Sequence, residues 1–252
     1  MEYDGGRLDM GRVASLLGLD EESAATQVAD AGLAYRDPQQ NDAWEPAHRY
    51  LSGNVRTKLA AARERAAEDP TFLGNVAALE RVQPSDLAPS EIKAKIGAPW
   101  IPVDVYNDFL AHLGFEDASV VHAGGTVWEV RGAKDGDLAR TEWGTGSRPT
   151  QDLFTALLRQ TESTLKVTWT DRDGRTYVDK EATDAAQEKA KLIAEAFEDW
   201  VWDDETRAAR LAKIYNHQFN NLVLPEYSPA ALTLPGLISD WTMKEHQNAA
   251  IR

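Results

Sequence analysis

The sequence of 252 residues contains no cysteine, which excludes disulfides, thiolate metal sites and cysteine nucleophiles together. It also contains no apolar run of about 18 residues, the length that a membrane-spanning helix requires. The opening residues, MEYDGGRLDM, include no apolar stretch of the kind found in signal peptides. From these absences we expect a soluble, globular protein of the cytoplasm with no membrane partner.

Sequence motifs that would identify a reaction are absent as well. There is no GxxxxGK[ST] phosphate-binding loop, no GxGxxG, no HExxH and no GxSxG. The acidic run Asp203-Asp204-Glu205 is typical of a helix start rather than of a magnesium site. Five histidines are scattered without the spacing of metal ligands, at His48, His112, His122, His217 and His246. We therefore predict no catalytic residue, no metal site and no cofactor in this chain, and no enzymatic activity of its own.

Positive charge is scarce, because 27 basic residues stand against 41 acidic ones and the formal net charge is −14. The negative charge is unevenly distributed, since residues 1–44 have a net charge of −6 and residues 181–252 have a net charge of −5. Residues 45–115 and 116–180 carry only −1 and −2. The negative net charge argues against a protein that binds nucleic acid along its whole length. Any phosphate-binding surface is expected between residues 45 and 180.

Residues 1–48 resemble a winged helix-turn-helix in the order of their expected elements. Apolar residues at helical spacing predict a first helix that Gly18 ends, and Asp20 can cap a second helix that runs through Val28. An extended segment and the turn DPQQND follow. The second helix carries no lysine or arginine to contact DNA phosphates, and it holds the acidic residues Asp20, Glu21, Glu22 and Asp30. We therefore favour a packing or protein-contact module over DNA recognition by this helix.

Residues 49–116 are predicted to be almost wholly helical, with Ser52 as a candidate cap of the first long helix. Two pairs of basic side chains in this helix are seven residues apart, nearly two turns, and each pair shares a face: Arg56 with Arg63, and Lys58 with Arg65. This face is either a solvated surface or a contact to the nucleic-acid backbone. The four residues are our candidates for phosphate contacts, and so few contacts predict weak binding with a shallow dependence on salt.

From residue 118 the apolar period changes to two, and residues 117–180 predict a small α+β unit. The strand candidates are ASVVHA, TVWEVR, RTEWGT, KVTWTD and RTYVDK, with hairpin turns at Gly124-Gly125 and Asp173-Gly174. The string PTQDLFTALLRQT is expected to form a helix that covers the sheet. The strands carry three tryptophans, Trp128, Trp143 and Trp169. These fill the core or form a base-stacking platform, and the core is the favoured interpretation.

Residues 181–252 are predicted to be helical. One long helix places five side chains on an apolar stripe, namely Ala186, Ala190, Ile193, Phe197 and Trp200. The sequence ends in WTMKEHQNAAIR, the start of a helix with no stop signal, so we expect it to be cut from a longer protein. The predicted fold class is α+β, mostly helical, with a winged-helix-like segment, a helical middle, a small antiparallel sheet with a covering helix, and C-terminal helices.

Five strings, taken together and in this order, resemble a known protein family: YLSGNVRTKL, GAPWIP, RLAKIYNHQFNNLV, LTLPGL and KEHQNAAIR. They are similar to the region before the ATPase core of large phage- and plasmid-borne helicases of the SNF2-like superfamily 2 type. Those helicases are often described as DNA methylase/helicase fusions, and some are linked to antirestriction or defence. The resemblance covers residues 10–252.

The resemblance implies roles for two residues near the C-terminus. Gln247 would belong to a Q-motif that reads the adenine edge of ATP, with Arg252 as the trailing basic residue of that motif. The phosphate-binding loop, the acidic motif and the second lobe of the motor would then lie beyond Arg252. ATP and Mg²⁺ would therefore serve only the motor of the parent protein, an ATP-dependent DNA helicase.

The sequence thus predicts a non-catalytic accessory region of a DNA helicase, which guides DNA or couples it to the motor. Its expected partners are DNA, bound weakly, and the downstream motor in the same chain. The alternative is a protein-interaction or oligomerisation module without affinity for DNA.

Overall fold

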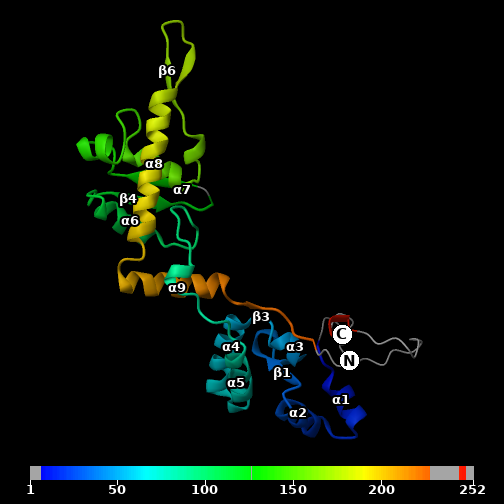
Figure 1. Ribbon diagram of the computed structural model, residues 1–252. Coiled ribbons are helices and arrows are strands. Elements are labelled where there is room, and N and C mark those ends of the chain that lie inside the picture. Colours follow the sequence, from blue (N-terminus) through cyan, green and yellow to red (C-terminus); the bar gives the residue numbers. More distant parts are fainter. Residues whose placement is uncertain (1–6, 126, 228–243, 248–252) are drawn as a thin grey trace. The chain divides into compact units, whose positions relative to one another are not determined.

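The computed structural model describes residues 7–125, 127–227 and 244–247. Contacts between backbone segments divide these residues into two compact units. The first unit holds the described residues up to Asp86 together with those from Asn216 onward, and the second unit is Leu87–Tyr215. Both units combine helices with short antiparallel strands, so the predicted α+β, mostly helical fold is confirmed (Figure 1).

The first unit is built from helices of up to four turns and two pairs of short strands. In chain order its elements are α1 (Met10–Leu17), α2 (Glu21–Asp30), β1 (Ala34–Asp37), β2 (Ala43–Pro46), α3 (Ala47–Tyr50), β3 (Gly53–Asn54), α4 (Val55–Glu68), α5 (Leu73–Arg81) and β8 (Leu222–Val223). β1 pairs with β2, and β3 pairs with β8, both antiparallel. A small core joins α3, α4 and α5 and consists of Tyr50, Val55, Leu59, Ala62 and Leu79.

Two helix starts in the first unit test the predicted caps. The carboxylate of Asp20 accepts a hydrogen bond from the amide of Ser23 at 2.9 Å, so the predicted cap of α2 is confirmed. The cap predicted at Ser52 is wrong, because α4 begins at Val55 and its N-cap is Asn54, whose side chain accepts from the amide of Thr57 at 3.0 Å. The physical reason is that residues 53 and 54 pair with β8, so the helix begins only after them.

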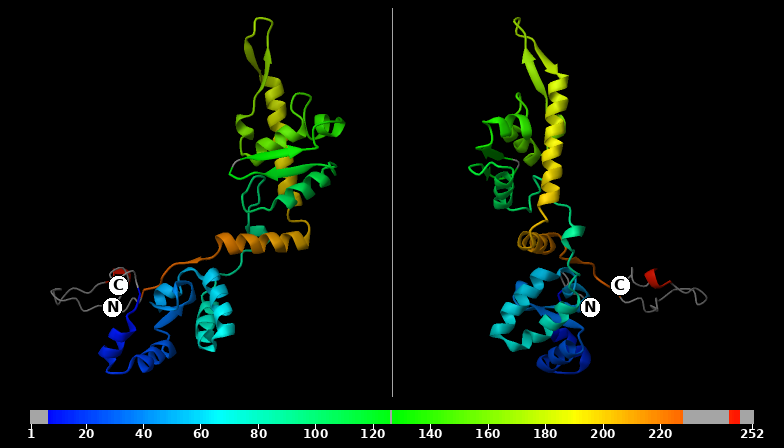
Figure 2. Two further views of the ribbon diagram at one scale, coloured as in Figure 1. Left: turned by 180° about the vertical axis from the view of Figure 1, so that it is seen from behind. Right: turned by 60° about the vertical axis from the view of Figure 1, so that its left-hand side comes forward.

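The second unit contains one long helix and several shorter elements. In chain order they are α6 (Val103–His112), β4 (Ser119–His122), β5 (Trp128–Arg131), a π-helical turn (Leu138–Glu142), α7 (Thr150–Leu158), β6 (Val167–Thr170), β7 (Thr176–Asp179), α8 (Lys180–Trp200) and most of α9 (Glu205–Phe219). The apolar stripe predicted on α8 is confirmed, because four of its five side chains are buried and Trp200 packs against the same core. The β6–β7 hairpin stands beyond the N-terminal end of α8 (Figure 2).

The strand predicted from the string RTEWGT is wrong. Residues 138–142 form the π-helical turn instead, and the amide of Trp143 closes it by donating to the carbonyl of Leu138 at 3.0 Å. Gly144 then passes so close to this turn that a Cβ atom there would lie 2.0 Å from the carbonyl oxygen of Ala139. In the described part of the chain, β4–β5 and β6–β7 are therefore separate two-stranded pairs and not one covered sheet.

Candidate nucleic-acid interface

Arg56, the first candidate for a phosphate contact, is held within the first unit. Its Nε donates to the carbonyl of Asn220 at 2.8 Å. A terminal nitrogen donates to the carbonyl of Pro84 at 3.2 Å and pairs with the carboxylate of Asp86. Arg56 thus joins α4 to two segments that are distant in the sequence. Because its side chain is only 18% exposed, it contributes to packing more than to an open surface.

Lys58 also points inward. Its ammonium donates to the carbonyls of Tyr50 and Arg49 at 2.9 and 3.1 Å, and it lies 3.7 Å from a carboxylate oxygen of Glu45. The side chains of Lys58 and Glu45 are 15% and 3% exposed. Lys58 therefore balances the charge of a buried carboxylate, which is a structural role.

Arg65 and Arg63 also have acidic partners. Arg65 pairs with Asp42 at 3.0 Å and with Glu68 at 3.1 Å, and the hydrogen bond to Asp42 is the main cause that raises the pKa of its guanidinium. Arg63 pairs with Glu80 at 2.8 Å and is the most open of the four, with 60% of its side chain exposed. A phosphate at α4 would compete with a carboxylate at each of the four positions. DNA contact by these residues stays a prediction.

Tyr50 is a buried ionisable residue in the core of the first unit. Its ring stacks on Tyr35 with centroids 5.3 Å apart, and its hydroxyl accepts a hydrogen bond from the side-chain amide of Asn75 at 3.0 Å. Burial is the main cause that raises the pKa of Tyr50 to about 12. The phenol is therefore neutral and structural at physiological pH, and it is not a candidate acid or base.

This shift predicts a loss of stability at high pH. An unfolded tyrosine ionises near pH 10, so between pH 10 and 12 the unfolded state releases the proton first and the folded state becomes relatively less stable. Below pH 10 both states are protonated and the contribution is fully present. We expect the wild type to lose about 1 kcal/mol more than Tyr50→Phe between pH 9 and 11, as measured by urea unfolding. Equal losses of stability in the two proteins would contradict the raised pKa of Tyr50.

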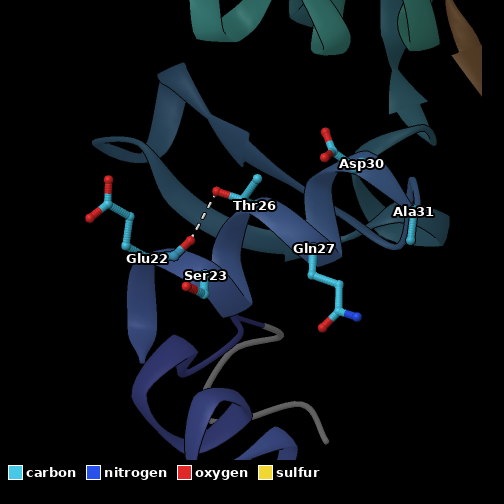
Figure 3. Close-up of a pocket in the computed structure, with 6 residues that line it drawn as sticks. All are labelled: Glu22, Ser23, Thr26, Gln27, Asp30 and Ala31. Atoms are coloured by element: carbon cyan, nitrogen blue, oxygen red, sulfur yellow. Dashed lines mark hydrogen bonds between the residues drawn. The ribbon is translucent and has the colours of Figure 1, made fainter. Parts of the chain in front are cut away.

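The acidic surface of α2 is hollowed (Figure 3). Among the residues that the structure describes, those that line the hollow are Glu22, Ser23, Thr26, Gln27, Asp30 and Ala31. The hydroxyl of Thr26 donates to the carbonyl of Glu22 at 2.9 Å, a bond within the helix. Two carboxylates and no cation occur among these lining residues, so the hollow offers no attraction to a phosphate. A packing or protein-contact role for α2 stays a prediction.

The three tryptophans predicted on strands occupy different environments. Trp128 lies on β5, is buried in the core of the second unit, and stacks on His122 with ring centroids 3.9 Å apart. Trp143 follows the π-helical turn and packs partly buried against the same core. These two confirm the core interpretation, and they exclude a platform made of all three rings. Trp169 on β6 differs, because 52% of it is exposed.

A groove beside α7 is lined by more positive than negative charge. Its lining residues, which we call the α7 groove, are Arg148, Asp152, Thr155, Ala156, Arg159, Thr161, Thr164, Leu165 and Lys166. They come from α7, from the residues on either side of it, and from the segment that leads into β6. Three cations thus stand beside one carboxylate. The hydroxyls of the three threonines already donate to backbone carbonyls, so they are occupied as donors.

Hydrogen bonds to backbone carbonyls orient the two arginines of the α7 groove, and Arg148 also pairs with the one carboxylate. Arg148 donates to the carbonyl of Lys166 at 2.8 Å, and another of its nitrogens lies 3.7 Å from Asp152. Arg159 donates to the carbonyl of Trp128 at 2.7 Å. Each arginine keeps further N–H groups for a ligand, because a guanidinium has five. Lys166 is exposed, and among the contacts of the described residues its ammonium has no partner.

Sequence reasoning did not single out Arg148, Arg159 and Lys166. They fall within residues 45–180, where the charge balance placed any phosphate-binding surface. They belong to three different stretches, one before α7, one at its end and one before β6, so no single periodic pattern links them. Only the fold brings them to one groove.

Gln247 lies in a helical turn of residues 245–247. Its side-chain oxygen accepts from the amide of Lys244 at 2.9 Å, and its own amide donates to the carbonyl of Lys244 at 2.9 Å. The oxygen that would accept from an adenine therefore caps its own turn in this structure. The adenine contact stays a prediction, and Arg252 lies outside the described residues.

Within residues 7–125, 127–227 and 244–247, no group of three or more His, Asp or Glu side chains is placed to hold a metal ion. Nor is any helix in those ranges long and apolar enough to cross a membrane.

A family model described as a domain of unknown function (DUF8437) matches residues 95–221, just over half of the chain. The matched range includes the whole α7 groove and the β6–β7 hairpin. No curated protein and no solved structure matches the chain.

Proposed function

The chain belongs to the DUF8437 family, whose description names no activity, and we propose that it is a non-catalytic, DNA-binding accessory region of a DNA helicase. In this role it grips or guides DNA while a motor outside these 252 residues hydrolyses ATP. The surface chemistry of the second unit supports the DNA-binding part of the proposal. The resemblance of the five strings supports the helicase part.

The observation that carries DNA binding is the α7 groove. Arginine and lysine neutralise backbone phosphates and donate hydrogen bonds to their oxygens. The groove combines Arg148, Arg159 and Lys166 with three threonines around a single carboxylate, Asp152. This composition suits a polyanion, in a chain whose net charge of −14 would otherwise repel one.

The α7 groove is a better phosphate site than the cations of α4. Each of the α4 cations has a carboxylate partner within the first unit, so binding DNA there would first break an ion pair. In the groove, Lys166 has no such partner among the described residues, and the arginines donate mainly to backbone carbonyls. Fewer existing ion pairs must therefore be broken when DNA binds.

Reversing the charge of Lys166 tests this proposal. Three phosphate contacts predict a slope of about −2 to −3 for the logarithm of the affinity against the logarithm of the salt concentration. Lys166→Glu is expected to reduce this slope by about 1 and to weaken DNA binding about tenfold at low salt. Fluorescence anisotropy with labelled duplex and single-stranded DNA at several salt concentrations measures both quantities.

A matched control is available on α9. Lys213 is exposed and belongs to the second unit, and no contact with another described residue involves its ammonium. Lys213→Glu makes the same change in net charge and is expected to leave the affinity within about twofold of the wild type. Absence of binding to either DNA at low salt, or equal effects of the two substitutions, would contradict the proposal.

A second candidate function is protein interaction through the first unit. Its supporting observation is a set of exposed leucines at the end of α1, in the loop after it and after α2, namely Leu16, Leu17, Leu19 and Leu33. Exposed apolar side chains that gather in one segment are typical of protein contacts. Self-association in light scattering, combined with no DNA affinity in the titration above, would favour this alternative.

A further inference from the structure

The β6–β7 hairpin has two exposed faces. Its strands pair antiparallel, with Trp169 opposite Tyr177 and Thr168 opposite Val178. Only the base of the hairpin is fixed to the rest of the unit, where Val167 is buried and its amide donates to the hydroxyl of Thr183 on α8 at 3.0 Å. The rest of the hairpin stands beyond the N-terminal end of α8 in every view (Figures 1 and 2). A two-stranded hairpin without a covering layer is marginally stable in water, so an exposed one of this kind gains from a partner.

One face of the hairpin carries an exposed aromatic pair. The rings of Trp169 and Tyr177 stack with centroids 5.0 Å apart and an interplanar angle of 26°. Trp169 is 52% exposed and Tyr177 42% exposed, although both are large and partly apolar. Among the tryptophans that the structure describes, only Trp169 is exposed to solvent, and the others are buried or partly buried. The pair therefore presents flat ring surface to solvent, and the fold of the second unit does not use that surface.

The charges around this pair are arranged for an anionic partner. Four exposed cations surround the strands, namely Lys166, Arg172, Arg175 and Lys180, and among the described contacts their charged groups have no partner. Of the four nearby carboxylates, Asp173 and Glu181 are exposed, and the other two accept hydrogen bonds from backbone amides. Asp171 accepts from the amides of Asp173 and Arg175 at 2.9 Å, and Asp179 caps α8 by accepting from the amide of Ala182 at 3.0 Å.

We propose that the β6–β7 hairpin binds unpaired nucleotides of single-stranded DNA, whose bases stack on Trp169 and Tyr177 while the hairpin cations contact the phosphates. This rests on the proposed DNA-binding function and adds to it a preference for single strands. Exposed aromatic rings combined with positive charge bind single strands with little dependence on base identity, because every base has a flat face that can stack. A base inside a duplex is already stacked on both sides and cannot offer that face.

Lys166 connects the hairpin to the α7 groove. It lines the groove and directly precedes the first residue of β6. A backbone bound in the groove can thus continue towards the hairpin, with duplex or single strand held in the groove and unpaired bases reaching the aromatic pair. The two surfaces are expected to respond differently to mutation, since the groove affects all DNA and the aromatic pair affects single strands.

Substitution of the aromatic residues tests the proposal on the whole chain. Trp169→Ala is expected to weaken binding of a labelled oligo-dT about tenfold and to leave duplex binding within about twofold, as measured by anisotropy at low salt. Trp169→Phe keeps a stacking ring and is expected to bind oligo-dT within about threefold of the wild type. Val178→Ala is the matched control, because Val178 is 52% exposed on the opposite face of the same hairpin.

A second measurement does not depend on how Trp169→Ala folds. Stacking on a base should quench the fluorescence of Trp169, so oligo-dT is expected to quench the wild type and to quench Trp169→Phe distinctly less. Equal quenching of the two proteins would overturn the proposal. So would equal losses of single-strand and duplex affinity in Trp169→Ala.

Failure of the DNA-binding proposal can be distinguished from failure of the hairpin proposal. If neither DNA binds at low salt, the DNA-binding proposal and the hairpin proposal both fail. If both DNAs bind and Lys166→Glu weakens them, while Trp169→Ala leaves oligo-dT affinity unchanged, only the hairpin proposal fails. Concentration-dependent self-association of the wild type that Trp169→Ala abolishes, without DNA affinity, would instead assign the hairpin to a contact between copies of the chain.

Discussion

Replacing Lys58 with methionine is expected to lower the free energy of unfolding of the first unit by about 3 kcal/mol. The carboxylate of Glu45 is almost fully buried, and one of its oxygens has no hydrogen-bond donor among the described residues. That oxygen lies 3.7 Å from the ammonium of Lys58. Without the ammonium, Glu45 would remain buried with only Arg49, at 3.9 Å from its other oxygen, to balance its charge. The carbonyls of Arg49 and Tyr50 would also lose a donor.

The effect can be measured on the whole chain by hydrogen exchange of the α4 amides in increasing urea. Arg63→Met is the control, because Arg63 lies on the same helix and its ion pair with Glu80 is in solvent, where such pairs contribute up to about 1 kcal/mol. The double substitution Lys58→Met with Glu45→Gln is expected to recover much of the loss, since it removes the buried charge. If Lys58→Met lowers the free energy of unfolding no more than Arg63→Met does, the structural role assigned to Lys58 is wrong.

The cations of α4 show what sequence spacing can and cannot predict. The spacing of seven residues correctly places Arg56, Lys58, Arg63 and Arg65 on one continuous helix. Spacing contains no information about partners from elsewhere in the chain, and those partners decide the role of a charged side chain. Arg56 bonds to Asn220, which is 164 residues away, and Lys58 balances Glu45 from the strand β2. A pair of charges separated in this way is visible only in the folded structure.

Local physical chemistry predicted most of the secondary structure. The cap at Asp20, the apolar stripe of α8 and the hairpin turn at Asp173-Gly174 depend on residues close in the sequence, and the structure contains all three. The cap predicted at Ser52 and the strand predicted from RTEWGT are wrong. In the second case the hydroxyl of Thr150 donates to the carbonyl of Ala139, and Gly144 passes close to that carbonyl, so the string lies in a turn. Strand propensity is a weak preference that tertiary contacts of this kind override.

The tryptophans of the second unit also show that the sequence pattern alone does not predict the environment of a side chain. Trp128 and Trp169 both occur in alternating strings that predict strands, and both lie on strands. Their environments differ because β5 packs against α7 and β6 projects beyond α8. Alternation indicates that one face of a strand is apolar, but it cannot say whether another layer covers that face. The sequence offered Trp169 as part of a base-stacking platform, but only the fold shows that its ring is exposed while that of Trp128 is buried.

A large loss of stability in the second unit is expected from Phe109→Ala, at about 3–5 kcal/mol. Phe109 is fully buried on α6, and its ring lies 5.1 Å from Phe197 and 5.2 Å from Trp200, centroid to centroid. Both partners belong to α8, so the truncation leaves a cavity between the two helices, and the rigid aromatic neighbours cannot easily collapse into it. Urea unfolding followed by tryptophan fluorescence measures the change.

Two further variants identify the cavity as the cause. Phe109→Leu retains most of the apolar volume and is expected to cost less than about 1.5 kcal/mol. Leu192→Ala removes a leucine from the exposed side of α8, where 44% of it is in solvent, and is expected to cost less than about 1 kcal/mol. Because this core also supports α7, Phe109→Ala should weaken DNA binding only in urea concentrations that unfold the second unit. Loss of DNA affinity while the unit is still folded would mean that α6 contributes to the interface directly.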